Sequence, residues 1–279
     1  MIKSFLSSSG AVSSGCIPFD FISPFMSGRD IDRATALCPN VKSVICAAFP
    51  YFASRDDGNI AKYARGRDYH KVVVERLSRV CEELKKEYHG GTFVPLTDAS
   101  PIPEVRAALM AGVGILGLNG LLAVPPYGAF VFLGEILTDV SLPYTAVDEI
   151  KLCSKCMLCV SSCPGNAIDP KTATINTDLC LSNLTQKNGD IPDFASGYIA
   201  SSGYVWGCDI CIDVCPMNAN PKRTDIKDFS ENLITRLRLE DIKNTTRRGF
   251  CERFPERAFT FRGPAPIIRN LKLKDKGNE

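Results

Sequence analysis

Eight of the chain's 13 cysteines lie between residues 153 and 215, and their spacing limits what this region can fold around. The first run is Cys153-x2-Cys156-x2-Cys159-x3-Cys163-Pro164, a spacing typical of proteins that hold two [4Fe–4S] clusters. In that arrangement three closely spaced thiolates bind one cluster and the fourth reaches a second cluster. The run therefore predicts two cubane clusters rather than one.

The second run is Cys208-x2-Cys211-x3-Cys215-Pro216, and it has only three cysteines because Val205 stands where its first one would be. Cys180, between the runs, is the natural replacement. We therefore predict two sets of ligands, which are Cys153, Cys156, Cys159 and Cys215 for the first cluster and Cys163, Cys180, Cys208 and Cys211 for the second.

Structural zinc and disulfides are the alternatives for so many cysteines. Zinc uses four cysteines as two CxxC pairs, which leaves the CxxxCP endings unexplained. Thiolate clusters need a reducing compartment, so we expect a cytoplasmic protein. The five other cysteines are then expected to be free buried thiols, namely Cys16, Cys38, Cys46, Cys81 and Cys251.

The composition is that of a soluble globular protein, with 45% hydrophobic and 23% charged residues. The formal net charge of +2 argues neither for nor against an anionic partner. The chain has no apolar run near the length of a membrane span, and MIKSFLSSSG is too short and too polar for a signal peptide. We therefore expect no membrane association.

Strands alternating with helices over residues 1–140 predict an α/β (α+β) domain. We expect helices at 2–9, 68–88 and after Pro101, strands at 41–49, 92–96, 121–124 and 129–137, and a loop or broken strand at 11–21. A linker at 141–151 precedes the cluster module, and the polar tail KLKDKGNE is expected to fray. The predicted domains are residues 1–145 (α/β), 146–222 (ferredoxin-like, two clusters) and 223–279 (helical and basic).

Three segments of the first domain place polar groups in apolar surroundings. Residues 63–70, YARGRDYH, open the long helix, and Asp68 there also suits an ordinary N-terminal cap. Asp98 ends a predicted strand, where open α/β sheets bind ligands, yet it also suits a helix cap. The glycine-rich stretch 112–120 follows a helix and precedes a strand, the wrong order for a dinucleotide fingerprint, so we favour a tight turn that admits a bulky ligand.

Together these segments resemble the epoxyqueuosine reductases, cobalamin-dependent iron–sulfur enzymes of queuosine tRNA maturation. The resemblance spans nearly the whole chain and rests on YARGRDYHK (63–71), TDASP with Glu104 and Arg106 (97–106), AGVGILGLNGLL (111–122), FLGEILTD (132–139), C-x-S-x-L-T (180–185) and WGCDICIDVCP (206–216). It implies a base-off cobalamin between the α/β domain and the nearer cluster, with electrons reaching the cobalt through the clusters. The electron donor is expected to be reduced flavodoxin or a ferredoxin-type protein.

The resemblance also implies roles for single residues. Asp98 would be the catalytic proton donor as the epoxide is reduced to the alkene, helped by an apolar ring that raises its pKa. Tyr69 and His70 would lie near the cofactor pocket. Ser182 and Asp209, each close to a cluster ligand in sequence, would face the corrin.

Two features depart from the family pattern. Ile115 and Leu118-Asn119-Gly120 stand where a Trp and a Lys-Asn-Thr-like stretch are usual, which could change what binds above the cobalt. We also expect a short form without the C-terminal helical-repeat domain that helps hold tRNA, so a tRNA partner is less well supported than the reductase machinery. Basic residues near the C-terminus could contact phosphates or form a solvated helical surface, namely Arg247, Arg248, Arg253, Arg257, Arg262 and Arg269.

Three functions remain open from the sequence. The first is a corrinoid-dependent reductase of epoxyqueuosine in tRNA, and the second is the same machinery acting on another small molecule. The third is an electron-transfer or corrinoid-activating protein. Asp98 favours the first two, because an electron carrier needs no proton donor beside its cofactor.

Overall fold

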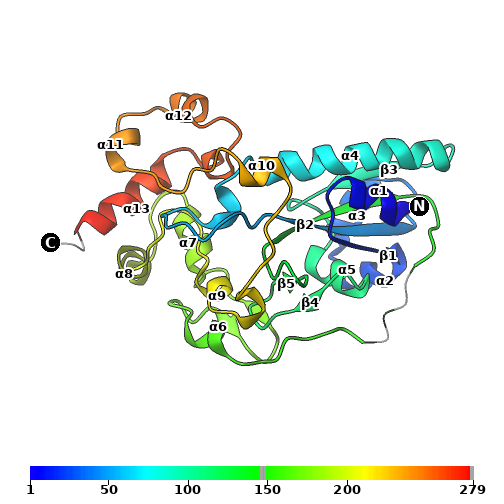
Figure 1. The fold of residues 1–279 in the computed structure, drawn as a ribbon, viewed down its shortest axis with the longest axis horizontal. Coiled ribbons are helices and arrows are strands. Elements are labelled where there is room, and N and C mark those ends of the chain that lie inside the picture. The colour runs from blue at the N-terminus through cyan, green and yellow to red at the C-terminus, as the bar shows by residue number, and fades with distance from the viewer. Residues whose placement is uncertain (145–146, 148, 277–279) are drawn as a thin grey trace. The chain divides into compact units, whose positions relative to one another are not determined.

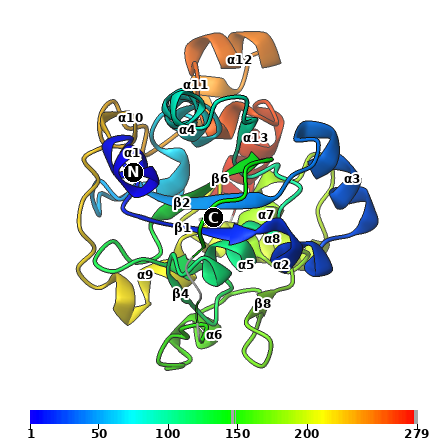
Figure 2. The ribbon, with the colours of Figure 1, turned by 90° about the vertical axis from the view of Figure 1, so that its right-hand side faces the viewer.

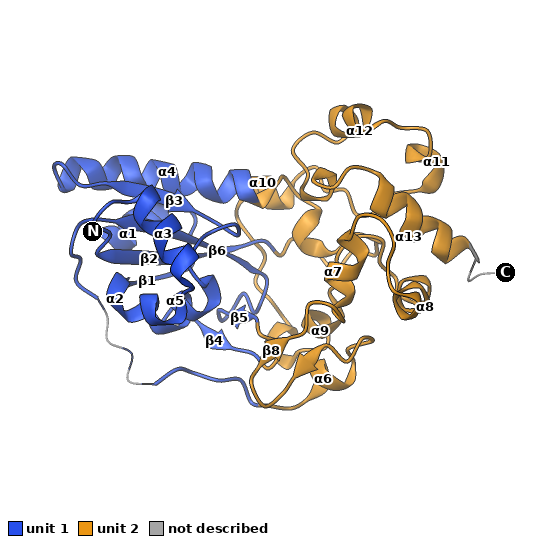
Figure 3. Cartoon of the chain, turned by 180° about the vertical axis from the view of Figure 1, so that it is seen from behind, with its two compact units in different colours: residues 1–51, 70–117, 121–154 blue, residues 52–69, 118–120, 155–279 orange. Residues whose placement is uncertain are grey.

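The computed structural model describes residues 1–144, 147 and 149–276, which form two compact units. Figure 3 colours the first unit, residues 1–51, 70–117 and 121–154, blue and the second unit, residues 52–69, 118–120 and 155–279, orange. The predicted domain boundary between residues 145 and 146, part of the predicted linker and the last three residues of the predicted tail lie outside the described residues. Segment 52–69 thus groups with the second unit although in sequence it lies between β2 (Ser43–Pro50) and β3 (Phe93–Leu96) of the first unit's sheet.

The first unit is built on a four-stranded sheet of order β1-β2-β6-β3 (Figure 1). The strands are β1 (Ser13–Pro18), β2 (Ser43–Pro50), β3 (Phe93–Leu96) and β6 (Val131–Thr138). Every neighbouring pair is antiparallel, with Cys46 and Leu96 both opposite Glu135. The mixed α/β class is confirmed. The sheet is antiparallel, however, whereas the interpretation of Asp98 as a ligand-binding residue relies on the parallel strands of open α/β sheets. Asp98 lies two residues after the end of β3.

Helices cover both faces of this sheet, as the side view in Figure 2 shows. Val44, Cys46 and Ala48 point to the face that packs against Ala107 and Leu109, whereas Ile45, Ala47 and Phe49 point to the other because strand side chains alternate. The helices are α1 (Ile2–Ser8), α2 (Phe19–Ile22), α3 (Gly28–Leu37), α4 (Tyr69–Glu87) and α5 (Glu104–Met110).

Helix α4 lies against the second face of the sheet at Gly134. A Cβ atom on Gly134 would lie 2.6 Å from Val73 Cγ1 and 2.8 Å from Leu77 Cδ1, so only glycine permits this approach. The predicted helix 68–88 is confirmed, because its apolar stripe, including Val73, Leu77 and Leu84, is buried.

A two-stranded ribbon, β4 (Ile115–Leu116) with β5 (Leu122–Ala123), follows α5. The sequence predicted β5 but not β4, which lies in the glycine-rich stretch. Gly114 packs directly on β5, since an added Cβ would stand 2.6 Å from the Ala123 carbonyl oxygen. The chain turns at residues 125–128, as expected, but β5 pairs with β4 and β6 joins the main sheet.

The second unit is a set of short elements around the cysteines and a helical segment after them. Its apolar core includes Ile60, Trp206, Phe250, Phe259 and Ile267. The elements are a 3-10 turn (Lys62–Ala64), α6 (Leu158–Ser161), β7 (Ile168–Asp169), β8 (Thr174–Ile175), α7 (Leu181–Gln186), α8 (Asp193–Ser201), α9 (Ile210–Asp213), α10 (Lys227–Ser230), α11 (Leu239–Ile242), α12 (Arg247–Arg253) and α13 (Ala265–Lys276).

The five cysteines that are not predicted cluster ligands are free thiols, but they are not all buried. Cys16, Cys38, Cys46 and Cys81 are buried as predicted, whereas Cys251 is exposed. The prediction for Cys251 was wrong because α12 buries its neighbour Phe250 and turns the next residue to solvent. Among the described helices, none is both long enough and apolar enough to cross a bilayer.

Candidate functional site

Four thiols of the second unit influence one another electrostatically. Cys211 is affected by Cys180 and Cys163 and also by Cys159 of the other predicted set, and Cys208 is affected by Cys211 and Cys180, so the four residues predicted for the second cluster lie near each other. Burial raises the pKa of Cys208 and raises that of Cys211 to about 12. Such thiols ionise only beside a strong positive charge, which bound iron provides. The donor set therefore fits an iron–sulfur cluster.

The loop of the first cysteine run has the backbone that closely spaced ligands require. Lys155 and Met157 adopt left-handed conformations with φ of 55° and 66°, which wind the chain tightly before α6. The Ala167 N–H donates to Cys163 Sγ at 3.3 Å, the kind of bond that tunes a cluster ligand. Cys153 groups with the first unit, where its N–H donates to the Leu116 carbonyl oxygen at 2.9 Å.

Val205 stands where the second run would have its first cysteine, and Cys180 is the predicted replacement. Val205 is fully buried in the second unit's apolar core, so it fills space instead of binding metal. Cys180 lies directly before α7, within electrostatic reach of Cys208 and Cys211. This geometry is consistent with Cys180 replacing the missing ligand, and that replacement remains a prediction.

Asn119 contacts Cys211, a predicted cluster ligand with which the sequence does not pair it. Its buried side chain hydrogen-bonds Cys211, which lowers the pKa of that thiol against the larger effect of burial. A donor to a ligand sulfur stabilises the more negative, reduced cluster. Asn119 was noticed only as a departure from a family pattern, since nothing in its sequence position indicates Cys211.

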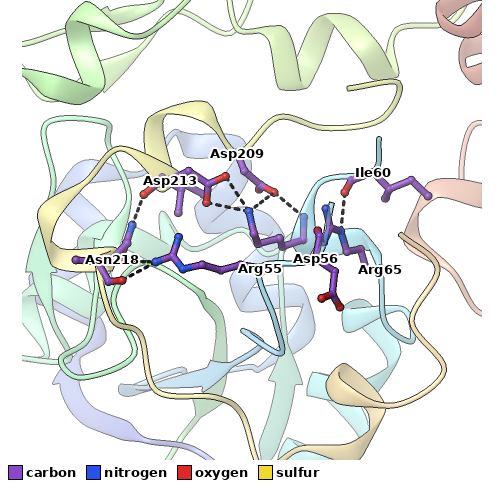
Figure 4. Close-up of polar contacts among 10 residues, drawn as sticks. Arg55, Asp56, Ile60, Arg65, Asp209, Asp213 and Asn218 are labelled. Atoms are coloured by element: carbon purple, nitrogen blue, oxygen red, sulfur yellow. Dashed lines mark hydrogen bonds and ion pairs between the residues drawn. The ribbon is translucent and has the colours of Figure 1, made fainter. Parts of the chain in front are cut away.

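Asp209 is fully buried beside the second cysteine run (Figure 4). Its Oδ2 accepts the Lys62 backbone N–H at 2.8 Å and lies 3.4 Å from Lys62 Nζ, which also bonds Asp213 at 2.8 Å. Burial raises the pKa of Asp209, and the Lys62 ammonium opposes that effect. Within the described part of the chain, Asp209 Oδ1 is buried without a hydrogen-bond donor.

Arginines tie segment 52–69 to the same region. Arg55 donates to the carbonyl oxygens of Asn218 and Ala219 at 2.7 Å, and Arg65 donates to those of Ile60 and Asp56 (Figure 4). Arg55 thus ties the segment to the residues that follow the second cysteine run, Arg65 braces the segment itself, and Lys62 contacts Asp209 within the run.

The other residues expected near a cofactor are placed as follows. Tyr69 begins α4 and packs edge-on against Tyr63, with ring centroids 6.3 Å apart. Ser182 is half-buried in α7, where its carbonyl oxygen accepts from Thr185 and Gln186 at 2.9 Å. Contacts of Tyr69, Ser182 and Asp209 with a cofactor remain predictions.

The structure brings His70 and Asp98 together in the first unit. His70 Nε2 lies 2.8 Å from Asp98 Oδ2, although 28 residues separate them in sequence. The side chains are 41% and 54% exposed, so both are accessible to a substrate. Asp98 has φ of 57°, a left-handed conformation uncommon outside glycine. An imidazole beside a carboxyl group orients it and exchanges a proton with it.

The loop that carries Asp98 is held by several hydrogen bonds. Thr97 Oγ1 donates to the Leu133 carbonyl oxygen at 2.7 Å, and Arg33 donates to that of Ala99 at 3.0 Å. The Asp98 N–H donates to Glu104 Oε1 at 2.5 Å. Glu104 in turn interacts with Glu135, which is 1% exposed. The sequence did not single out either glutamate as a site residue.

The basic residues near the C-terminus mostly have partners within the second unit. Arg257 and Arg269 donate to backbone carbonyl oxygens, and burial lowers the pKa of both. Arg248 and Arg253 pair with Glu252 and Asp241. These contacts favour the predicted alternative of a solvated helical surface, with acids and bases interleaved.

Two family descriptions match this chain. "Epoxyqueuosine reductase QueG, DUF1730" matches residues 32–99, a range that contains His70 and Asp98. "4Fe-4S double cluster binding domain" matches residues 152–218, which contain all eight predicted ligands. Two cluster-binding sets in this segment are therefore confirmed, although the assignment of individual cysteines remains a prediction.

Curated relatives carry one name. An epoxyqueuosine reductase of Cyclobacterium marinum is 38% identical over 190 residues, covering 64% of this chain and 59% of the relative. The enzyme of Bacillus subtilis is 28% identical over 250 residues, covering 85% of this chain and 63% of the relative. The matches thus span less than two thirds of these relatives.

Solved structures share the fold. The crystal structure of a selenomethionine-labelled epoxyqueuosine reductase superposes with a TM-score of 0.82 at 24% identity, covering 98% of this chain and 80% of that one. An epoxyqueuosine reductase with an epoxyqueuosine-modified tRNA-Tyr stem loop gives 0.81 at 23% identity, covering 98% and 79%. Two family descriptions and the curated relatives thus make this chain similar to the epoxyqueuosine reductases, and the solved structures show that it shares their fold.

Proposed function

We propose that this protein reduces epoxyqueuosine in tRNA, with electrons passing through two [4Fe–4S] clusters to a base-off cobalamin. The observation that carries this proposal is the His70–Asp98 pair, joined at 2.8 Å within the segment that matches the epoxyqueuosine reductase description. An electron carrier has no use for an exposed acid held this way, so the pair favours an enzyme over a carrier.

The reaction requires two electrons and two protons. Both carbon–oxygen bonds of the epoxide break, a carbon–carbon double bond forms, and the oxygen leaves as water. Asp98 donates a proton to the epoxide oxygen, and His70, hydrogen-bonded to Asp98, orients the carboxyl group and returns a proton to it. A solved epoxyqueuosine reductase of Bacillus subtilis is described with a catalytic aspartate loop swung out of its active site; we propose loop 97–102 as the counterpart here.

A cobalamin would supply a strong low-valent metal reductant that the side chains cannot provide. Asp209, next to Cys208 in the second cysteine run, is one of the residues we propose near the cofactor. Tyr69 and His70 from the start of α4, and Ser182 from α7, are the other residues we propose near the cofactor.

The proposed partners are tRNA and a low-potential electron donor of the flavodoxin or ferredoxin type. One structural relative is described with a tRNA stem loop, and the family name implies that substrate. Arg247, Arg248 and Arg262 are the proposed phosphate contacts because they are exposed, whereas Arg257 and Arg269 are partly buried and donate to backbone carbonyl oxygens.

The test is the tRNA of a strain that lacks this gene. We expect epoxyqueuosine to accumulate, and the wild-type gene to restore queuosine. Asp98→Asn should fail to restore it, because losing a general acid lowers turnover by about 10²–10⁴-fold. Glu82→Gln, at an exposed acid of α4, is the matched control and should restore it fully. Unchanged tRNA in the deletion strain would reject the proposal.

A further inference from the structure

A carboxyl group lies inside the apolar core of the first unit. Glu135 is 1% exposed and lies on the same face of β6 as Leu133 and Leu137, opposite Cys46 of β2 and Leu96 of β3. Burial raises the pKa of Glu135 well above its ordinary value. Glu135 Oε2 is buried without a donor among the described residues, as suits a neutral acid better than a carboxylate.

Glu104, the first residue of α5, is the partner of Glu135. A side-chain hydrogen bond joins the two carboxyl groups, and it raises the pKa of Glu135 while lowering that of Glu104. Because carboxylates only accept hydrogen bonds, such a contact needs a proton, which these directions place on Glu135. Burial nevertheless raises the pKa of Glu104 to about 7.

The polar and titratable groups around the pair are compatible with a proton on Glu135 and a carboxylate at Glu104. Asp98 and His70 face it from loop 97–102 and from α4, and the Ser100 side chain lowers the pKa of Glu135 slightly. The Cys46 thiol faces it from β2, and burial raises the pKa of that thiol so that it stays neutral. Among the described residues, His70 is the one group whose positive charge acts on the pair, and it lowers the pKa of Glu104.

The pair is connected directly to Asp98. Glu104 Oε1 accepts the Asp98 backbone N–H at 2.5 Å, and the Asp98 residue is left-handed, with φ of 57°. A carboxylate accepts such a bond about twice as strongly as a neutral group. The ionised Glu104 therefore holds the backbone in a conformation that the residue would otherwise leave.

We propose that Glu104 and Glu135 form a positioning pair in which protonated Glu135 donates to the Glu104 carboxylate, and Glu104 fixes the Asp98 backbone so that the Asp98 side chain faces the substrate. This inference rests on the proposed role of Asp98. It adds two positioning residues that do not touch the substrate themselves.

Hydrogen exchange at the Asp98 amide tests the connection without any turnover. After correction for the intrinsic rate, protection in the wild type should rise as the pH increases from 6 to 8, because Glu104 loses its proton near pH 7 and accepts more strongly. The protection factor of the Asp98 amide should fall at least tenfold in Glu104→Ala, and in Glu104→Gln it should not change with pH. Glu82→Gln should behave as the wild type. Unchanged protection in Glu104→Ala would overturn the proposal.

Infrared spectroscopy tests the proton on Glu135. At pH 8 the wild type should show the carbonyl stretch of a protonated carboxyl group, and Glu135→Gln should lack it while keeping a donor to Glu104. A band that persists in Glu135→Gln would contradict the proposal. Hydrogen exchange and infrared spectroscopy need no turnover, so they test the positioning pair even if the protein does not act on tRNA. A failure of the proposed function can therefore be told apart from a failure of this inference.

Turnover gives the functional consequence. If the protein is active, Glu104→Ala should lower kcat at least tenfold with KM unchanged, and should add nothing in an Asp98→Asn background, since both changes remove one unit. Full additivity in the double variant would show that Glu104 acts independently of Asp98 and would overturn the positioning role.

Discussion

At the scale of single residues, Lys62 and Asp209 carry the most consequential charges of the second unit. Asp209 is fully buried, Lys62 donates to it from both backbone and side chain, and the Lys62 side chain is only 10% exposed. Removing one partner of a buried ion pair leaves the other uncompensated, which costs far more than the pair contributes.

Lys62→Met should therefore lower the free energy of unfolding by about 3–5 kcal/mol near neutral pH. Asp209 has a raised pKa in the folded protein, so the folded state binds a proton more readily than the unfolded chain does. The free energy of unfolding therefore falls as the pH rises from the pKa of Asp209 in the unfolded chain to its pKa in the folded protein. Without Lys62 this loss grows, so the variant should be least impaired in acid. Chemical denaturation at several pH values measures both effects.

Lys227→Met is the control, because Lys227 is 82% exposed and lies 3.8 Å from Glu231. Exposed pairs contribute about 0–1 kcal/mol, so this variant should match the wild type closely. Asp209→Asn added to Lys62→Met should recover part of the stability. Equal losses for Lys62→Met and Lys227→Met would contradict the importance of the buried pair.

At the scale of elements, the turn before α7 supplies the fourth ligand proposed for the second cluster. Cys180→Ala should remove that ligand and lower the iron content from about eight to about four atoms per chain, because each cubane holds four. Iron analysis and the visible absorption of anaerobically purified protein measure the loss. Cys251→Ala, at an exposed thiol, should keep all of the iron; full iron in Cys180→Ala would contradict the ligand assignment.

The packing of α4 on the sheet depends on Gly134. Gly134→Ala would place a Cβ 2.6 Å from Val73 Cγ1, and such overpacking costs about 1–3 kcal/mol. Gly28→Ala, in α3 with nothing within 4 Å of the added carbon, should instead be neutral or stabilise by about 0.4–1 kcal/mol. Thermal denaturation distinguishes them, and equal melting temperatures for the two variants would show that α4 adjusts freely.

Elements with strong periodicity could be predicted from the sequence, and short ones could not. The apolar stripe of α4 gave its limits to within a residue, whereas β4 has only two residues and no detectable pattern. The cysteine spacing indicated the cluster ligands because the metal requires that spacing. The Glu104–Glu135 contact depends on the packing of α5 against β6, which sequence periodicity does not specify.

At the scale of the whole molecule, the sequence features and the two matched domains agree on one kind of chemistry. Residues 152–218 match a cluster-binding domain, and residues 32–99 supply an accessible acid paired with a histidine. An electron supply and a proton donor are the two requirements of a reductive cleavage of a carbon–oxygen bond. We propose that both serve a cobalamin-dependent reduction of epoxyqueuosine in tRNA.

The most direct test is the conversion of epoxyqueuosine-containing tRNA by the anaerobically purified protein with both clusters loaded, a chemical reductant, and cobalamin present or omitted. Mass spectrometry of the digested nucleosides reads the product. Queuosine should form only when cobalamin is present. Conversion at the same rate without cobalamin, or no conversion by the cobalamin-loaded wild type, would contradict the account.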